Sequence, residues 1–202
     1  MPLEVTIATA NPAKAAHLRD LCEGLDVRFS NSSKQQLRTE ENASTHLGNA
    51  IAKAVACSRY AEGAALASDG GLVIPCLGDL WESTLTHRAT GGNITDSERA
   101  RRLLARMRHL LLQQRNAYWA EAIAIARDGI LVCAWETDGM QGQIGNAFRA
   151  DPYGANGFWA DGLWETYSGK KRWELSTMER ASLSDPWVQL FPVVNGFLAR
   201  MI

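Results

Sequence analysis

Thr9-Ala-Asn-Pro-Ala-Lys14 joins an apolar run, Leu3–Ala8, to a helical pattern that has Pro12 near its first position. A strand, a short turn and a helix start leave backbone N–H groups free at the positive end of a helix dipole. Lys14 adds a cation one turn into the helix, and the whole arrangement suits a phosphate group. The stretch is not a Walker loop, because it lacks the two glycines and the Lys-Ser or Lys-Thr pair. The alternative is a lysine that serves only solubility.

Periodicity along the rest of the chain predicts an α/β fold with a mixed sheet. Strands are predicted over residues 3–8, 27–29, 64–67, 72–74, 118–127, 130–136 and 140–144. Helices are predicted over residues 13–22, 45–62 and 95–114, and from residue 186 onward. Asp128-Gly129 is a strong hairpin signal, while Ser68-Asp-Gly-Gly71 and Asp138-Gly139 predict further tight turns.

Bulk properties limit the class of protein. The 202 residues suffice for one domain, 1–202, or for two closely packed lobes without a separate linker. A net charge of −1 argues against general nucleic-acid binding, which needs a basic surface. No apolar run reaches the roughly 18–20 residues that cross a bilayer, and the N-terminus does not resemble a secretion signal. Four widely spaced cysteines indicate reduced, buried thiols in a cytoplasmic protein and disfavour a zinc site: Cys22, Cys57, Cys76 and Cys133.

Four features could converge on one functional site: Asn11 with Lys14, Glu40-Glu41, Asn49 with Lys53, and Asp69. Asn49 and Lys53 are four residues apart and share a helix face. Asp69 lies at a predicted strand end, where open α/β sheets bind ligands. Together the features supply two lysines for phosphate charge and two carboxylates for a hard divalent cation. The alternatives are a solvated helix edge, a simple turn residue and a polar loop.

The order and spacing of these pieces resemble the inosine/xanthosine triphosphate pyrophosphatase family, which removes aberrant purine nucleotides. That family opens with a strand and Thr-x-Asn-x-x-Lys, matched here by Thr9–Lys14. Its glutamate and its Thr-Phe-x-Glu-Asn-Ala-x-x-Lys-Ala helix are matched by Glu41 and by Thr45-His-Leu-Gly-Asn-Ala-Ile-Ala-Lys-Ala54. Its Asp-Asp-Ser-Gly-Leu stretch is matched by Ser68-Asp-Gly-Gly-Leu72, and its Ser-Ala-Arg segment by Thr86-His-Arg88. The most specific part of the resemblance covers residues 5–96.

The resemblance implies an elongated mixed sheet with flanking helices, two lobes around a central cleft, and a homodimer. It implies Mg²⁺ held by Glu41 and Asp69, and Asp69 as the general base that activates water. Lys14 and Lys53 would grip the triphosphate and act with Asp69 in catalysis. The implied substrate-binding residues are Thr9, Asn11, Lys14, Asn49, Lys53, Gly70, Arg88, Phe158, Trp159, Asp161, Arg180 and Asp185.

The chain departs from the family pattern in two regions. Ser68 replaces the first of the two aspartates, so one carboxylate is lost from the metal end. The family's Gly-Phe-Gly-Tyr-Asp-Pro loop is matched by Gly157-Phe-Trp-Ala-Asp-Gly162, and its Glu-Lys by Glu179-Arg180. Its base-reading Ser-His-Arg falls on Ser184-Asp-Pro186. Two donors to purine oxygens are therefore missing, and Asp185 would favour an amino group over a keto group.

These observations lead to two hypotheses from different classes. The first is a Mg²⁺-dependent nucleoside triphosphate pyrophosphatase whose base preference, inosine or xanthosine in the family, has altered. The alternative is a catalytically weak or inactive relative that binds nucleotide or a protein partner. Trp81, Trp159 and Trp164 lie in predicted loops, where one could stack on a base, although core packing is the commoner role. The arginine-rich helix over residues 95–114 is either a partner surface or a solvated face.

Overall fold

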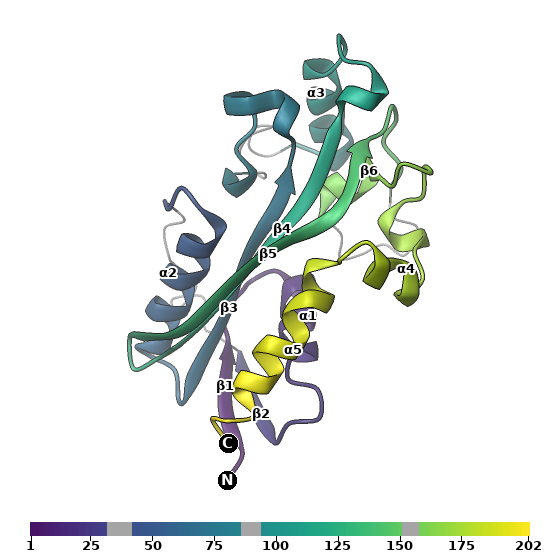
Figure 1. Ribbon diagram of the computed structural model, residues 1–202. Helices are drawn as coiled ribbons and strands as arrows, with labels where there is room; N and C mark the ends of the chain where they lie inside the picture. Colours follow the sequence, from purple (N-terminus) through teal and green to yellow (C-terminus); the bar gives the residue numbers. More distant parts are fainter. Residues whose placement is uncertain (32–41, 86–93, 151–157) are drawn as a thin grey trace. The chain divides into compact units, whose positions relative to one another are not determined.

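The computed structural model describes residues 1–31, 42–85, 94–150 and 158–202, and these form a six-stranded mixed sheet with helices beside it (Figure 1). The strand order is β2-β1-β3-β4-β5-β6. β1 pairs in parallel with both β2 and β3, whereas β5 pairs antiparallel with β6. The strands are β1 (Leu3–Ile7), β2 (Val27–Asn31), β3 (Ala64–Val73), β4 (Asn116–Arg127), β5 (Ile130–Ile144) and β6 (Trp164–Glu165). The predicted α/β class with a mixed sheet is confirmed.

The chain divides into two compact units, neither of which is a continuous piece of sequence. Unit 1 comprises Met1–Gly70, Glu121–Thr137 and Pro186–Ile202. Unit 2 comprises Gly71–Ala120 and Asp138–Asp185. The α-helices are α1 (Pro12–Asp20), α2 (His46–Ser58), α3 (Asp96–Arg106), α4 (Thr177–Ser182) and α5 (Pro186–Leu198), and short 3₁₀ helices occur between them.

In unit 1, alternate strand residues pack against different helices. One face of the sheet carries large aliphatic side chains, among them Leu66 and Ile123, which pack with α1 and α5. The other face carries alanines, among them Ala67 and Ala122, which let α2 approach closely. Figure 1 shows α2 on one side of these strands and α1 with α5 on the other. Successive strand side chains point to opposite faces, so a residue's parity decides which helix it meets.

Side-chain caps explain where the first helices of unit 1 begin. Asn11 Oδ1 accepts hydrogen bonds from the N–H groups of Ala13 and Lys14 at 2.9 and 3.2 Å, and proline follows at the first helical position. Thr45 Oγ1 accepts from the Gly48 N–H at 3.0 Å and so starts α2. Both helices were predicted from the sequence, and both end a few residues earlier than expected.

The predicted tight turn at Ser68–Gly71 is wrong. β3 runs without a break through these residues from Ala64 to Val73. Two adjacent glycines permit a turn but do not require one, and the glycines with positive φ in the described chain lie elsewhere, at 24, 63, 78, 129 and 169. Asp69 therefore projects from the middle of a strand and not from a loop.

The hairpin between β4 and β5 is confirmed. Asp128 and Gly129 have φ of 53° and 78°, the signs that a type I′ turn requires. The second predicted turn, at Asp138-Gly139, is wrong, because β5 continues through it to Ile144. Met140 takes a φ of 51° and donates its N–H to the Leu183 carbonyl at 2.7 Å, so this irregular step is accommodated inside the strand.

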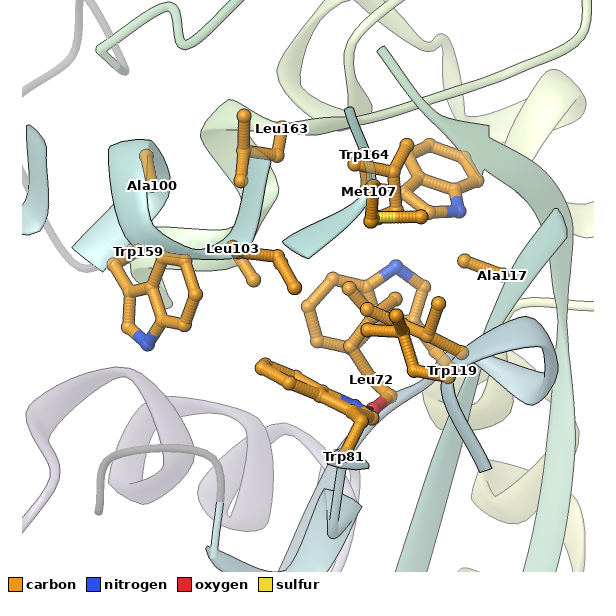
Figure 2. Close-up of a cluster of buried hydrophobic side chains, with 14 of the residues drawn as sticks. Leu72, Trp81, Ala100, Leu103, Met107, Ala117, Trp119, Trp159, Leu163 and Trp164 are labelled. Carbon is orange, nitrogen blue, oxygen red and sulfur yellow. Dashed lines mark hydrogen bonds between the residues drawn. The ribbon is translucent and has the colours of Figure 1, made fainter. Parts of the chain in front are cut away.

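Unit 2 has its own core, which is rich in tryptophan. Figure 2 shows Trp81, Trp119, Trp159 and Trp164 gathered with Leu103 and Met107 of the α3 region. Trp81 Nε1 donates to the Leu72 carbonyl at 2.7 Å. Trp81, Trp159 and Trp164 are all buried, so core packing is the role the structure gives them.

The remaining expectations concern surface charge and thiols. Arg101 and Arg102 of α3 both bind Glu98, as on a solvated helix face. All four cysteines are free thiols, but only Cys22 and Cys57 are buried as predicted; Cys76 is exposed and Cys133 is partly exposed. Burial raises the pKa of Cys22 and of Cys57 to about 11. Within the described ranges, none of the helices has the length and apolar character that crossing a bilayer requires.

Candidate functional site

Asp69 accepts hydrogen bonds from two side chains of α2. Lys53 Nζ lies 2.7 Å from Oδ1 of Asp69, and His46 Nδ1 lies 2.7 Å from Oδ2. Because a carboxylate can only accept, the imidazole nitrogen is the donor in the second contact. Lys53 Nζ also lies 3.4 Å from the Ser68 carbonyl oxygen. Both oxygens of Asp69 are thus held by groups from one helix face.

The charges around Asp69 keep it ionised. Burial on its own would raise the pKa of this carboxyl group. The hydrogen bond from His46 and the positive charges of Lys14 and Lys53 outweigh burial and hold the pKa of Asp69 below its ordinary value. Asp69 is therefore a carboxylate at neutral pH, which suits the binding of a cation or the orientation of a water molecule.

Lys14 approaches the same stretch of β3 from α1. Its Nζ lies 3.4 Å from the Gly70 carbonyl oxygen and 3.2 Å from Oε1 of Glu121 on β4. Glu121 is buried, and burial raises its pKa while the charge of Lys14 partly opposes that shift. Lys14 and Lys53, predicted from separate motifs, therefore both bind within residues 68–70 of β3.

Two residues of this group were not predicted as site residues. His46 occupies the position of the phenylalanine in the family's helix motif, and only the structure shows its contact with Asp69. Glu121 is the one charged residue in the apolar run from Ala117 to Ala126. That isolated charge was a usable signal, because a charged group in a buried strand needs a partner.

The predicted phosphate loop differs in detail from expectation. Two of the N–H groups expected to be free at the start of α1 are instead bound to Asn11 Oδ1. Thr9 Oγ1 accepts from the Asn11 N–H at 3.1 Å, so both side chains shape the loop itself. Asn49 Oδ1 accepts from the Ala43 N–H at 3.1 Å, whereas its buried Nδ2 has no hydrogen-bond partner among the described residues.

The carboxylates in this region fit a metal that needs few protein ligands. Asp69 supplies a hard oxygen donor, and Glu41, the other predicted ligand, lies outside the described residues. Within the described ranges, no three acidic, histidine or cysteine side chains form a metal-binding group. Mg²⁺ commonly keeps several waters and takes one or two carboxylates together with substrate phosphates, which matches this sparse set.

The residues predicted for the base end form a separate cluster in unit 2, centred on Arg172. Its Nη2 lies 3.4 Å from Oδ2 of Asp185, and its Nη1 lies 3.7 Å from Oδ1 of Asp161. Its Cζ lies 5.1 Å from the centre of the Trp119 ring, a cation–π distance. Asp185 is only 2% exposed, so the expectation that its carboxylate faces an amino group of a base finds no support in this arrangement.

Phe158 and Arg180, two other base-end residues, contact this cluster. Phe158 packs edge-on against Trp119 at 5.3 Å between ring centres, and Trp159 is buried in the core of unit 2. Arg180 Nη2 lies 3.5 Å from the Arg172 carbonyl oxygen. Arg88 lies outside the described residues, so its predicted role stays a prediction.

We call the five residues that meet around β3 in unit 1 the unit 1 group: Lys14, His46, Lys53, Asp69 and Glu121. Taken by itself, this group has the composition of a polyphosphate site. Two ammonium groups can meet phosphate oxygens as point charges, and one of them, that of Lys53, contacts the ionised carboxylate of Asp69. Charge that develops on a phosphoryl group in transfer is best met by lysines and a metal ion, with a carboxylate to orient water. The chemistry these residues support is cleavage of a phosphoanhydride by water.

Comparisons with known proteins give one consistent result. The sequence model of the Ham1 family matches residues 5–185. A dITP/XTP pyrophosphatase from Thermus thermophilus is 31% identical over 185 residues, which cover 90% of this chain and 86% of that protein. A HAM1 protein from Coxiella burnetii superposes with a TM-score of 0.77 at 27% identity, covering 96% of this chain and 99% of the other. The Staphylococcus aureus Ham1 protein, at 22% identity, shares the fold with a TM-score of 0.76.

Proposed function

This chain belongs to the Ham1 family, and we propose that it is an enzyme that hydrolyses a nucleoside triphosphate to a nucleoside monophosphate and pyrophosphate. The observation that carries the proposal is the convergence of Lys14 and Lys53 on residues 68–70 of β3, beside the ionised Asp69. Relatives whose names state dITP/XTP pyrophosphatase activity supply the reaction class.

The two lysines would bind the phosphates from opposite faces of the sheet. Lys14 comes from α1 and Lys53 from α2, and each is half-buried with its ammonium group held near β3. In a half-buried setting an ion pair with phosphate is stronger than in bulk water, because screening is weaker. Lys14 and Lys53 would then neutralise the charge that grows on the leaving pyrophosphate.

Asp69, with Glu41 as the second carboxylate, would hold a divalent cation that we take to be Mg²⁺. When bound, such an ion polarises the phosphoryl oxygens and lowers the pKa of nearby water. Asp69 would orient the attacking water and accept its proton. Its lowered pKa makes it a weak base but a reliable carboxylate, so orientation and metal binding contribute more than proton affinity does.

We propose further that the base preference differs from that of relatives that act on dITP and XTP. The histidine and arginine that read the purine in the resembled family are replaced here by Asp185 and Pro186. Asp185 is buried, and its carboxylate pairs with the guanidinium of Arg172. With these donors missing, inosine or xanthosine triphosphate can still be a substrate but without strong selection over other bases.

Two further features of the proposal rest on the resemblance. We expect a cytoplasmic enzyme that forms a homodimer. Four free thiols, one of them exposed, suit a reducing compartment. Size-exclusion chromatography with light scattering tests the dimer directly.

A nucleotide panel tests the reaction class. The purified chain is incubated with Mg²⁺ and inosine, xanthosine, guanosine, adenosine and pyrimidine triphosphates, in ribose and deoxyribose forms, and the products are separated by ion exchange. We expect monophosphate and pyrophosphate. A diphosphate product would contradict the cleavage position. No turnover of any nucleotide, with binding retained in calorimetry, would favour the alternative of an inactive relative that binds nucleotide.

A further inference from the structure

Glu121 is a buried carboxylate in direct contact with a predicted catalytic residue. It projects from β4, is 7% exposed, and receives Lys14 Nζ at 3.2 Å across 107 residues of sequence. An ionised side chain buried to this degree is costly unless a charged partner satisfies it. The partner here is the lysine to which the phosphate grip is assigned, so the pair belongs to the site and not to the general scaffold.

Ser68 lies on the same face of the sheet as Glu121. Leu66 and Ile123 both pack with α1 and α5, and Ser68 and Glu121 are each two residues away from one of them along their strands. Side chains two apart in a strand share a face, and β3 and β4 are neighbours in the sheet. Ser68 is fully buried, and its Oγ has no hydrogen-bond partner among the described residues.

The charge balance of the site explains why a carboxylate is needed on this face. The family pattern that the chain resembles has two adjacent aspartates where this chain has Ser68 and Asp69. Asp69 faces α2 and binds Lys53, whereas the serine leaves the α1 face without an acidic group from β3. Glu121 restores two carboxylates for two lysines, from the next strand of the sheet.

We propose that Glu121 is the positioning residue and counter-ion of Lys14, and that it takes the place of the carboxylate missing at residue 68. This inference rests on the proposed function. Lysine has a flexible stem and a point-like charge, so it needs an acceptor to hold it in one place. Glu121 on β4 and the Gly70 carbonyl on β3 both bind the Lys14 ammonium group. These contacts orient the ammonium group before the triphosphate binds.

A rescue experiment tests the substitution of one carboxylate for the other. In Glu121→Ala we expect KM for the preferred triphosphate to rise by about 10- to 100-fold, the size of a lost hydrogen bond to a charged group, with a smaller change in kcat. Adding Ser68→Asp should recover at least about tenfold of that loss. The matched control is Glu165→Ala, which removes the partner of the buried Lys171 in unit 2 and should leave KM unchanged. An unchanged KM in Glu121→Ala overturns the proposal, as does a folded double variant no better than the single one.

A double-mutant cycle read by binding tests the same inference if the Glu121→Ala, Ser68→Asp variant does not fold or if the chain turns over no nucleotide. Binding of inorganic pyrophosphate is measured by calorimetry for the wild type, Glu121→Ala, Lys14→Ala and the combination of the last two. Since Glu121 acts through Lys14, its loss should weaken binding in the wild type by about 10-fold or more and have almost no effect in Lys14→Ala. Equal effects in both backgrounds, or tighter binding in Glu121→Ala, would overturn the inference. Absence of nucleotide turnover with the cycle intact would overturn only the proposed reaction.

Discussion

The unit 1 group around Asp69 and the Arg172 cluster in unit 2 both pair cationic side chains with buried carboxylates, but their arrangements differ. In the first, two lysines are each balanced by one carboxylate, and the ammonium groups stay half-buried. In the second, one guanidinium lies between Asp161 and Asp185 and over the Trp119 ring. Lysines can transfer their contacts to a phosphate, whereas a planar guanidinium fixed on three sides acts as a scaffold. From this comparison we propose that the unit 1 group binds phosphate, and that the base-reading positions of the resembled family have a structural role in this chain.

The largest expected effect breaks the unit 1 group. Asp69→Asn keeps the shape of the side chain but removes the charge that both α2 groups bind and that a metal ion needs. Loss of a general base alone typically costs 10²–10⁴-fold in rate, so we expect turnover to fall by at least about 10²-fold. Steady-state kinetics on the preferred triphosphate measure the effect. Near-normal turnover in a folded Asp69→Asn variant would remove Asp69 from the mechanism.

The next prediction concerns the Arg172 cluster, where stability should change more than chemistry. Arg172→Met takes a cationic partner from Asp185, and breaking a buried pair usually costs about 3–5 kcal/mol. We expect the free energy of unfolding to fall by about 3 kcal/mol in urea titrations. The matched control is Arg101→Met, whose pair with Glu98 lies on the exposed face of α3 and should change stability little. A stable Arg172→Met variant with altered base preference would make Arg172 a substrate-reading group instead of a scaffold residue.

Much of the fold could be predicted from local sequence. Asn11 and Thr45 are strong helix caps, and the helices predicted to begin at residues 13 and 45 begin within one residue of those positions. Asp128-Gly129 permits only a narrow set of turns, and the hairpin was predicted correctly. Ser68–Gly71 failed because glycines widen the choice of backbone angles without selecting one. The pairing of β3 with its neighbours decides the outcome there, and a local pattern does not contain that information.

The site residues also separate into those that local motifs predicted and those that only long-range packing brings together. Lys14, Lys53 and Asp69 were predicted because their motifs occur in order at characteristic separations, and the structure brings them together. Glu121 was missed because its partner lies 107 residues away and only sheet order joins them. The capture of Asp185 by Arg172 was missed for the same kind of reason, since it depends on packing around Trp119.

Base selectivity gives a smaller effect that sharpens the comparison. If the base-reading positions have a structural role, neither the Asp185 nor the Pro186 side chain donates a hydrogen bond to a keto oxygen of the base. A site that donates to a substrate group can discriminate by about 10⁴-fold, so the ratio of kcat/KM for inosine over adenosine triphosphate should stay below about 10². The ratio is measured by direct competition of the two nucleotides. A preference well above that limit would show that donors outside Asp185 and Pro186 read the base.

The smallest expected effect separates the two carboxylates within the unit 1 group by their response to pH. Burial raises the folded-state pKa of Glu121, so its contribution to stability is present at low pH and is lost as the pH rises through that raised value. Glu121→Gln, which imitates the protonated form, should therefore gain stability over the wild type as the pH rises.

The pKa of Asp69 is lowered, against the effect of burial, by His46 and the two lysines. The contribution of Asp69 to stability is therefore present above the unfolded pKa and is lost as the pH falls through the folded value. Asp69→Asn should thus lose stability relative to the wild type at neutral pH and approach it in acid. Urea unfolding of the three proteins from about pH 2 to pH 8 measures both trends, because the change for Asp69 lies below the ordinary pKa of 3.8. Differences of the same sign would mean that the two carboxylates do not occupy the opposed environments that their contacts indicate.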